Sequence, residues 1–294
     1  MRVNPNPMPD LLAALNQTEL EEQQASLQIS TGKSVNEPSD NPAAAALLVE
    51  NNDQATFNSG YLQSLTAVQG QFSTADSTLS SVTSALQQAL SLGVEAGGGT
   101  LSASDLTAIA NQLQEIQGQV LSLANTTYQG NYIFAGTLTN AAPFVAGIGP
   151  SGVNYVGNTD VNEVSIGDGY NLTVNVPGSQ LFSSPTNDVF LALTNLIQAV
   201  QTNTGISAAV TAISGASSYL SAQAVFYGNA AQQATSQTTY LNAAKLQLSQ
   251  QQNTLGGADL AAAATNLSQA QTDNQAALAA ISKFSQNDLF DYLT

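Results

Sequence analysis

The sequence contains no cysteine, no histidine and no tryptophan. Without cysteine it can form neither a disulfide bond nor a thiolate nucleophile. Without cysteine and histidine together it also lacks the Ser-His-Asp and Cys-His catalytic arrangements and the usual protein ligands of zinc and haem. Catalysis would have to rest on carboxylates alone, so we expect no cofactor, no metal site and no enzymatic activity.

Charged residues are also scarce. Only 8% of the residues are Asp, Glu, Lys or Arg, whereas ordinary soluble domains contain roughly a quarter. The chain has 20 acidic and 4 basic residues, which gives a formal net charge of −16. The basic residues are too scattered to form a patch for a phosphate backbone, and the negative charge repels nucleic acid and anionic lipid. We therefore expect neither nucleic acid nor a membrane as a partner.

Long apolar runs and a secretory signal are missing as well. The longest apolar runs, such as residues 43–49, are too short to span a bilayer. Residues 1–10 contain three prolines, where a cleaved signal would need a basic stretch followed by a continuous apolar segment. Taken alone, these absences predict a cytoplasmic protein.

Heptad periodicity is the clearest pattern that the sequence does contain. Paired apolar rows run through residues 65–89 and, after the glycines at 97–99, through residues 106–123. This spacing predicts two helices of the coiled-coil type, folded back on each other as an antiparallel hairpin. Ser104 and Asp105 suit the start of the second helix. The rows are Leu65, Phe72, Leu79 and Leu86 with Val68, Ala75, Val82 and Ala89, then Leu106, Leu113 and Val120 with Ile109, Ile116 and Leu123.

A third periodic segment occupies residues 207–255. An apolar or aromatic residue recurs every seven positions from Leu220 to Leu255, with Ala234 in the same row. At about 1.5 Å per residue, this helix would be on the order of 70 Å long. Apolar rows at this spacing usually form a protein's own core, and we assign the rows at residues 60–127 and 206–255 to that role.

The two ends of the chain each predict one amphipathic helix, at residues 10–29 and beyond the glycines at 256–257. Neither helix has an obvious partner near it in sequence. An apolar stripe without a partner leaves a helix disordered or bound to another molecule, so we predict an assembly interface at both ends. Its residues are Leu12, Leu15, Leu20, Leu27, Leu267, Ile281, Phe284, Leu289, Phe290, Tyr292 and Leu293.

Between the helices, residues 128–182 lose the helical period, and Gly, Asn, Pro and Thr alternate with Val, Ile and Tyr. Residues 171–176 alternate strictly between polar and apolar side chains, as a half-buried strand does. Residues 161–166 and 153–156 are further strand candidates, and residues 129–131 suit a hairpin turn. Helix is expected to resume near Asp188. The pattern predicts a mainly α fold with a small β insertion.

The sequence therefore divides into five parts. We expect an N-terminal helix and turn at residues 1–40 and a rod-like helical hairpin at 41–130. A small β-rich domain follows at 131–186, then rod helices at 187–255 and a C-terminal helix at 256–294.

Two patterns weakly suggest a metal site or a catalytic site. Asn158, Asp160, Asn162 and Glu163 resemble the start of a calcium loop, but the glycine at the sixth position and the closing glutamate are absent. A glycosidase would need two carboxylates roughly 5 to 10 Å apart in a cleft. The candidates Asp160, Glu163 and Asp168 lie among turn residues, so a secreted lytic glycosidase remains a remote alternative.

Three separated segments carry a resemblance to a known family. Residues 30–45, with the turn residues Gly32, Pro38, Ser39, Asp40 and Pro42, resemble the turn after the first helix of flagellin-like axial proteins. Residues 123–137 with 142–144 resemble the middle stretch of that family, and residues 281–293 resemble its C-terminal signature. Within the family, the Pro-Ser-Asp-Asn-Pro sequence at residues 38–42 is closer to proteins of the hook-filament junction than to filament flagellin.

The resemblance implies an elongated antiparallel helical bundle, a flagellin-like rod, with terminal coiled-coil helices and an outward-facing β domain. It implies a subunit that polymerises on the first junction protein at the end of the hook and on which flagellin assembles. Export would run through an export chaperone and the flagellar type III apparatus to the outside of the cell, which needs no cleaved signal. The loose form of the opening residues 1–6 and the scarcity of basic residues keep filament flagellin open as the alternative.

Overall fold

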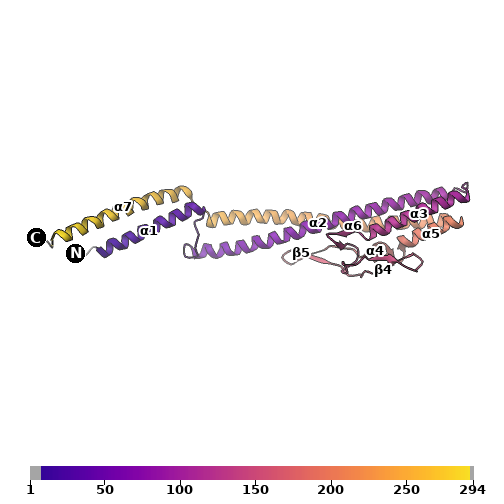
Figure 1. Ribbon diagram of the computed structural model, residues 1–294, viewed down its shortest axis with the longest axis horizontal. Helices are drawn as coiled ribbons and strands as arrows, with labels where there is room; N and C mark the ends of the chain where they lie inside the picture. Colours follow the sequence, from indigo (N-terminus) through magenta and orange to yellow (C-terminus); the bar gives the residue numbers. More distant parts are fainter. Residues whose placement is uncertain (1–7, 292–294) are drawn as a thin grey trace. The chain divides into compact units, whose positions relative to one another are not determined.

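The computed structural model describes the backbone of residues 8–291 and the side chains of residues 8–283. Long helices dominate this part of the chain (Figure 1). They divide between two compact units, one formed by Met1–Phe57 with Ala243–Thr294 and the other by Asn58–Asn242. The helices are α1 (Met8–Thr31), α2 (Pro42–Ala96), α3 (Ala103–Ala124), α4 (Gly178–Leu181), α5 (Val189–Thr202), α6 (Ile206–Gly256) and α7 (Leu260–Asp291).

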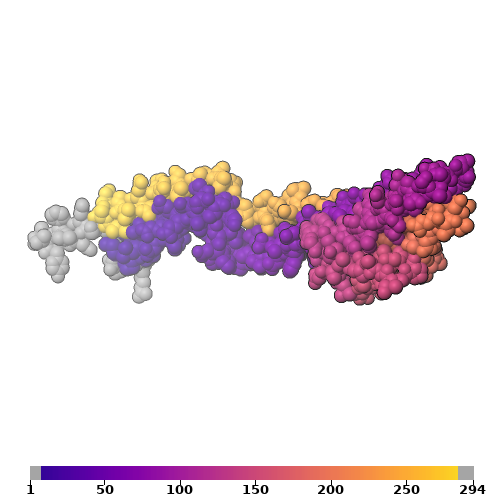
Figure 2. Space-filling view, turned by 45° about the vertical axis from the view of Figure 1, so that its right-hand side comes forward, coloured from indigo at the N-terminus to yellow at the C-terminus, as the bar shows by residue number. Residues whose placement is uncertain are grey.

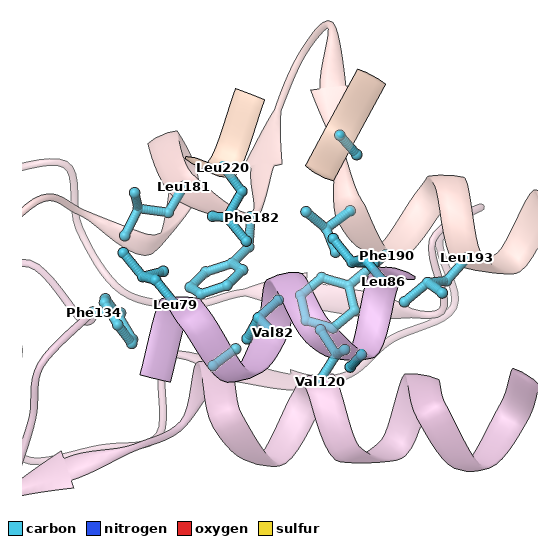
Figure 3. Packing of buried hydrophobic residues seen from close by; sticks show 14 of the residues in the cluster. Leu79, Val82, Leu86, Val120, Phe134, Leu181, Phe182, Phe190, Leu193 and Leu220 are labelled. Atoms are coloured by element: carbon cyan, nitrogen blue, oxygen red, sulfur yellow. The ribbon is translucent and has the colours of Figure 1, made fainter. Parts of the chain in front are cut away.

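The unit at 58–242 is built on one hydrophobic core to which α2, α3, α5 and α6 all contribute. Figure 3 shows Leu79 and Leu86 of α2, Val120 of α3 and Leu193 of α5 converging in this core. The heptad rows expected at residues 65–89 and 106–120 are buried throughout. The predicted helical hairpin is therefore confirmed, and these rows serve the protein's own core.

The turn between α2 and α3 ends one helix and starts the next. The N–H of Gly97 donates to the carbonyl of Gly93 at 3.0 Å, and Gly99 has a φ of +74°. The cap of α3 is Ser102, and Ser104 and Asp105 lie in the first turn, as expected for the start of the helix. The hydroxyl of Ser102 accepts a hydrogen bond from the N–H of Asp105, whose carboxylate accepts one from the N–H of Ser102. These reciprocal bonds satisfy two N–H groups that have no partner within the helix.

The β insertion consists of four two-stranded antiparallel hairpins that do not join into a larger sheet in the described part of the chain. The expected turn at residues 129–131 is confirmed, because Gln129 and Gly130 both have positive φ, at 51° and 84°, as a tight hairpin of this kind requires. The hairpins pair β1 (Thr127–Tyr128) with β2 (Asn131–Tyr132), β3 (Phe144–Ala146) with β4 (Val153–Tyr155), β5 (Glu163–Gly167) with β6 (Tyr170–Thr173), and β7 (Ser183–Ser184) with β8 (Asn187–Asp188).

Aromatic packing joins this insertion to the helical core. Phe144 and Phe182 meet edge to face with ring centroids 5.5 Å apart, and Phe144 lies 5.4 Å from Phe190 at the start of α5. Phe134 lies 5.3 Å from Phe182. All four rings are buried, so the insertion shares one core with the helices that flank it.

The strand expected at residues 171–176 is shorter, because β6 ends at Thr173. The following three residues bond to helices and loops rather than to another strand. The carbonyl of Val174 accepts a hydrogen bond from Gln71 of α2, and the N–H of Val176 donates to the hydroxyl of Tyr227 on α6. The alternating sequence at residues 171–176 therefore contains two structures. Its first three residues belong to strand β6, and its last three are buried outside any strand.

Two hydrogen bonds join the α1–α2 turn to the α6–α7 turn within the other unit. The N–H of Ser34 donates to the carbonyl of Gly256 at 2.8 Å, and the N–H of Ala258 donates to the carbonyl of Gly32 at 3.0 Å. This unit also includes the first turns of α2 and the last turns of α6. Its limits therefore differ from the boundaries expected at 40/41 and 255/256, because both helices run on without a break.

Candidate assembly surface

Helices α1 and α7, from opposite ends of the chain, lie side by side (Figures 1 and 2). Shielded positions recur along each helix every three or four residues, as in a coiled coil. Along α1 they include Leu11, Leu15, Thr18, Glu22, Ala25 and Gln28, and along α7 Ala263, Leu267, Ala270, Asn274, Ala277 and Ile281. We call these two rows the terminal seam.

The terminal seam is poor in large apolar side chains. Its buried members, Ala25, Ala263 and Ala270, are all alanines. Glu22 lies partly buried in the seam and accepts a hydrogen bond from Gln271 at 3.4 Å. Small and polar residues let the helices approach, but they remove little apolar surface from water. The pairing of α1 with α7 therefore gains less from hydrophobic burial than the leucine-rich core at 58–242.

The predicted interface residues fall into two groups. Leu15, Leu267 and Ile281 are partly buried in the terminal seam. Leu12, Leu20 and Leu27 are exposed by 47%, 60% and 42%. At 100° per residue, these three leucines lie within about 80° of one another, on a face of α1 roughly opposite the seam. We call this exposed row the outer leucine row.

The remaining predicted residues are not described at the level of side chains. The structure describes the backbone of Phe284, Leu289 and Phe290 as part of α7, but it does not describe their side chains. Tyr292 and Leu293 lie outside the described residues altogether.

Sequence reasoning missed some exposed apolar side chains at the chain ends. Leu260 and Leu278 of α7 and Ile29 of α1 are also solvent-exposed. Leu278 directly follows Ala277, which lies in the terminal seam. The size of Leu278 could have indicated that it is exposed, since a large apolar residue directly after a member of a row of alanines points away from that row.

Gly32 ends α1 in a conformation that other residues rarely adopt. Its φ is +67°, and its N–H donates to the carbonyl of Gln28 at 2.9 Å, as glycine does just after a helix terminus. No atom lies near the position of a Cβ. Glycine is therefore favoured here by backbone conformation and not by crowding.

Asp40 holds the rest of the turn together. Its carboxylate accepts hydrogen bonds from the N–H groups of Asn36 at 2.9 Å and Glu37 at 3.0 Å, and from the amide of Gln24 at 3.2 Å. These bonds, led by that from Glu37, lower the pKa of Asp40 below its ordinary value. A single side chain thus connects the turn to α1.

The other residues of the turn between α1 and α2 start α2 or line a groove beside it. Pro42 occupies the first position of α2, where the absence of an N–H costs no helical hydrogen bond, and Asn41 caps the helix by accepting from Ala44 at 3.1 Å. The hydroxyl of Ser39 donates to Glu37 at 3.4 Å. Pro38 lines a groove of about 560 Å³ together with residues that include Val35, Leu48, Val49, Gln252 and Gly256.

The residues considered for catalysis or metal binding do not form a site. Asp160, Glu163 and Asp168 are all exposed. Asn158 donates one hydrogen bond to Asp160 at 2.8 Å and another to Thr137. Among the residues that the structure describes, no cluster of three or more acidic side chains could hold a metal ion, and no helix is long and apolar enough to cross a membrane.

Two family models match the chain. The bacterial flagellin N-terminal helical region matches residues 7–139, and the bacterial flagellin C-terminal helical region matches residues 198–293. Neither model covers residues 140–197, which include most of the β insertion and the part of α5 up to residue 197.

Curated relatives agree with these models. The chain is 38% identical to flagellar hook-associated protein 3 of Salmonella typhimurium over 162 residues, which are 55% of this chain and 50% of that protein. It is 37% identical to the protein of the same name from Escherichia coli, with the same coverage. The chain thus matches about half the length of these curated relatives.

Solved structures share the fold at low sequence identity. A structure from Vibrio parahaemolyticus described as a flagellar hook-associated protein superposes with a TM-score of 0.60 at 19% identity, over 74% of this chain and 97% of that one. FlgL of Bacillus cereus superposes with a TM-score of 0.52 at 22% identity, over 73% of this chain and 99% of that one.

Proposed function

The chain belongs to the bacterial flagellin family, and on that premise we propose that it is a structural subunit of the junction between the flagellar hook and filament. The observation that carries the proposal is the identity of 38% to flagellar hook-associated protein 3 over 162 residues. On this proposal the protein has no catalytic role and acts on the flagellum, outside the cell.

The proposed mechanism is mechanical and depends on the ends of the chain. The outer leucine row of Leu12, Leu20 and Leu27 is exposed, although burying a leucine side chain fully is worth roughly 1.5 to 3 kcal/mol. Packing of neighbouring subunits against this row would bury it. The polar terminal seam suits the same model, because a weakly held helix pair is stabilised when further copies pack around it.

The proposed partners follow from the position of a junction. One surface of the assembled ring would rest on the first junction protein at the end of the hook, and the other would receive flagellin. Before assembly, we expect an export chaperone to bind the apolar rows of the terminal helices and the type III apparatus to export the chain.

The test is to delete the gene in its native host and to examine the cells by negative-stain electron microscopy, together with the protein shed into the medium. The proposal predicts bare hooks and free flagellin in the medium. Complementation with the intact gene is the control and should restore attached filaments.

Two other outcomes would contradict the junction role. Complete filaments on the deleted cells would show that the junction forms without this chain. Missing filaments without flagellin in the medium would indicate that the chain is the filament subunit itself.

A further inference from the structure

The unit at 58–242 has a one-sided charge distribution. It contains eight acidic residues and no basic residue. Two copies of this unit therefore cannot form a salt bridge with each other. All its charges are carboxylates on α2, α3 and the β insertion, namely Asp76, Glu95, Asp105, Glu115, Asp160, Glu163, Asp168 and Asp188.

Within this unit, α5 and α6 carry no charge. From Val189 to Ala244 the sequence contains no Asp, Glu, Lys or Arg, and Lys245 is the first charged residue after Asp188. Many side chains of this part of α6 are exposed, including Ser218, Ala222, Asn229, Gln232, Gln233 and Ser236. We call the exposed side of residues 211–240 the acid-free face of α6.

Two large apolar side chains are exposed on the same face. Val225 is 58% exposed and Tyr240 is 65% exposed. They lie 15 residues apart, which places them within about 60° of each other around the helix. The buried side of α6, which includes Leu220, Tyr227 and Leu241, lies roughly opposite. The acid-free face thus combines neutral polar side chains with apolar ones.

Exposure alone does not explain the absence of charge. Helix α1 is also largely exposed, and it carries Asp10, Glu19, Glu21 and Glu22 within 24 residues. Helix α3 exposes Asp105 and Glu115. A helix face that only meets water gains from charged residues, because they keep the chain soluble. In this respect the acid-free face differs from the exposed faces of α1 and α3.

We propose that the acid-free face of α6 is the surface against which a second copy of this chain packs; the inference rests on the proposed junction function and names its contact surface. Carboxylates facing each other across an interface repel, and a carboxylate buried without a partner is costly. Since the unit at 58–242 offers no cation to offset them, a contact between two copies of this unit is most favourable where carboxylates are absent. Neutral polar groups and the side chains of Val225 and Tyr240 meet that condition.

Isosteric glutamine-to-glutamate substitutions test this surface. The variant Gln232→Glu with Gln233→Glu adds two carboxylates to the acid-free face, where both glutamines are exposed. The matched control, Gln112→Glu with Gln119→Glu, adds the same charge to exposed positions of α3 beside Glu115. Each gene is expressed in the native host from which the chromosomal copy has been deleted, and attached filaments are counted by electron microscopy. Circular dichroism of each purified full-length chain reports its folding.

We expect the α6 variant to reduce the number of attached filaments about tenfold, since carboxylates buried in an interface without a cation are costly, while the α3 control matches the wild type. Higher ionic strength in the growth medium should partly restore the α6 variant, because salt screens the repulsion between the added carboxylates and the acidic residues of the second copy. Equal filament numbers for both variants, whether normal or reduced, would overturn the inference. If the wild-type gene itself fails to restore filaments, the proposed junction function is wrong and the inference falls with it.

Discussion

At the scale of single residues, backbone conformation and hydrogen bonds explain the most distinctive sequence motif of the chain. Gly32 supplies a positive φ, and Asp40 accepts two backbone N–H groups and one side-chain amide. Each residue of the turn can therefore be tested by a change that removes one interaction.

Replacing glycines in two different conformations should shift stability in opposite directions. Gly32→Ala forces a Cβ into a left-handed conformation and should lower the free energy of unfolding by about 1 kcal/mol. Gly118→Ala, in the open middle of α3, should raise it by roughly 0.5 to 1 kcal/mol because alanine favours the helix. Urea denaturation followed by circular dichroism measures both. A neutral effect at Gly32 would contradict the assigned conformation.

Two hydrogen-bonded carboxylates, Asp40 and Asp105, predict a loss of stability in acid. Hydrogen bonds lower the pKa of Asp40, those from Glu37 and Asn36 first, and the bonds from the hydroxyl and N–H of Ser102 lower that of Asp105. A lowered folded-state pKa contributes stability above the unfolded value of about 3.9, and this stability is lost as the pH falls through the folded value.

Thermal unfolding between about pH 5 and pH 2 checks this sign. The Asp105→Asn variant should show a smaller decrease of the melting temperature with acid than the wild type, because it no longer has that carboxylate to protonate. An unchanged or steeper decrease would contradict the assignment.

At the scale of secondary structure elements, α6 holds the β insertion through Tyr227. The ring is buried, its hydroxyl accepts a hydrogen bond from the N–H of Val176 at 3.2 Å, and Phe72 of α2 packs against it with a centroid distance of 6.1 Å. Burial raises the pKa of the Tyr227 hydroxyl, so this group stays neutral and keeps the hydrogen bond over the ordinary pH range.

Tyr227→Phe should lower the free energy of unfolding by about 1 to 3 kcal/mol, because it leaves the buried N–H of Val176 without a partner while the ring is kept. Tyr240→Phe, on an exposed side chain of the same helix, is the matched control and should change stability by less than about 0.5 kcal/mol. Chemical denaturation compares the two. Equal effects would mean that the Tyr227 hydroxyl contributes no net stability.

At the scale of the whole molecule, folding and assembly should depend on different residues. The core at 58–242 buries its leucines within one chain, whereas the outer leucine row is exposed. Leu20→Ser with Leu27→Ser should therefore leave the unfolding free energy of the purified chain within about 0.5 kcal/mol of the wild type. The same variant should reduce the number of attached filaments in complemented cells.

The control is Gln23→Ser with Ser30→Ala, which changes exposed polar residues of the same helix. It should leave both the stability and the number of filaments unchanged. If the leucine variant unfolds more easily but still supports filaments, the outer leucine row stabilises the single chain and is not an assembly surface.

Much of this protein could be read from residue spacing alone. The heptad rows of α2 and α3, the hairpin turn at Gln129 and Gly130, and the long helix α6 are set by local periodicity and by φ preferences, which act within a few residues. The resemblance to flagellin-like proteins rested on the same kind of contiguous pattern. Because these signals are local, they can be recognised without knowing which residues pack against them in the core.

Only the tertiary structure decided which face of each terminal helix is shielded. The amphipathic pattern placed Leu12, Leu15, Leu20 and Leu27 in one interface, yet Leu15 lies in the terminal seam and the other three leucines face away from it. The pairing of α1 with α7 joins residues that are more than two hundred positions apart, and no local pattern encodes its register. The docking of Val174 and Val176 on α2 and α6 was hidden for the same reason, since alternating residues look alike whether a strand or a helix covers them.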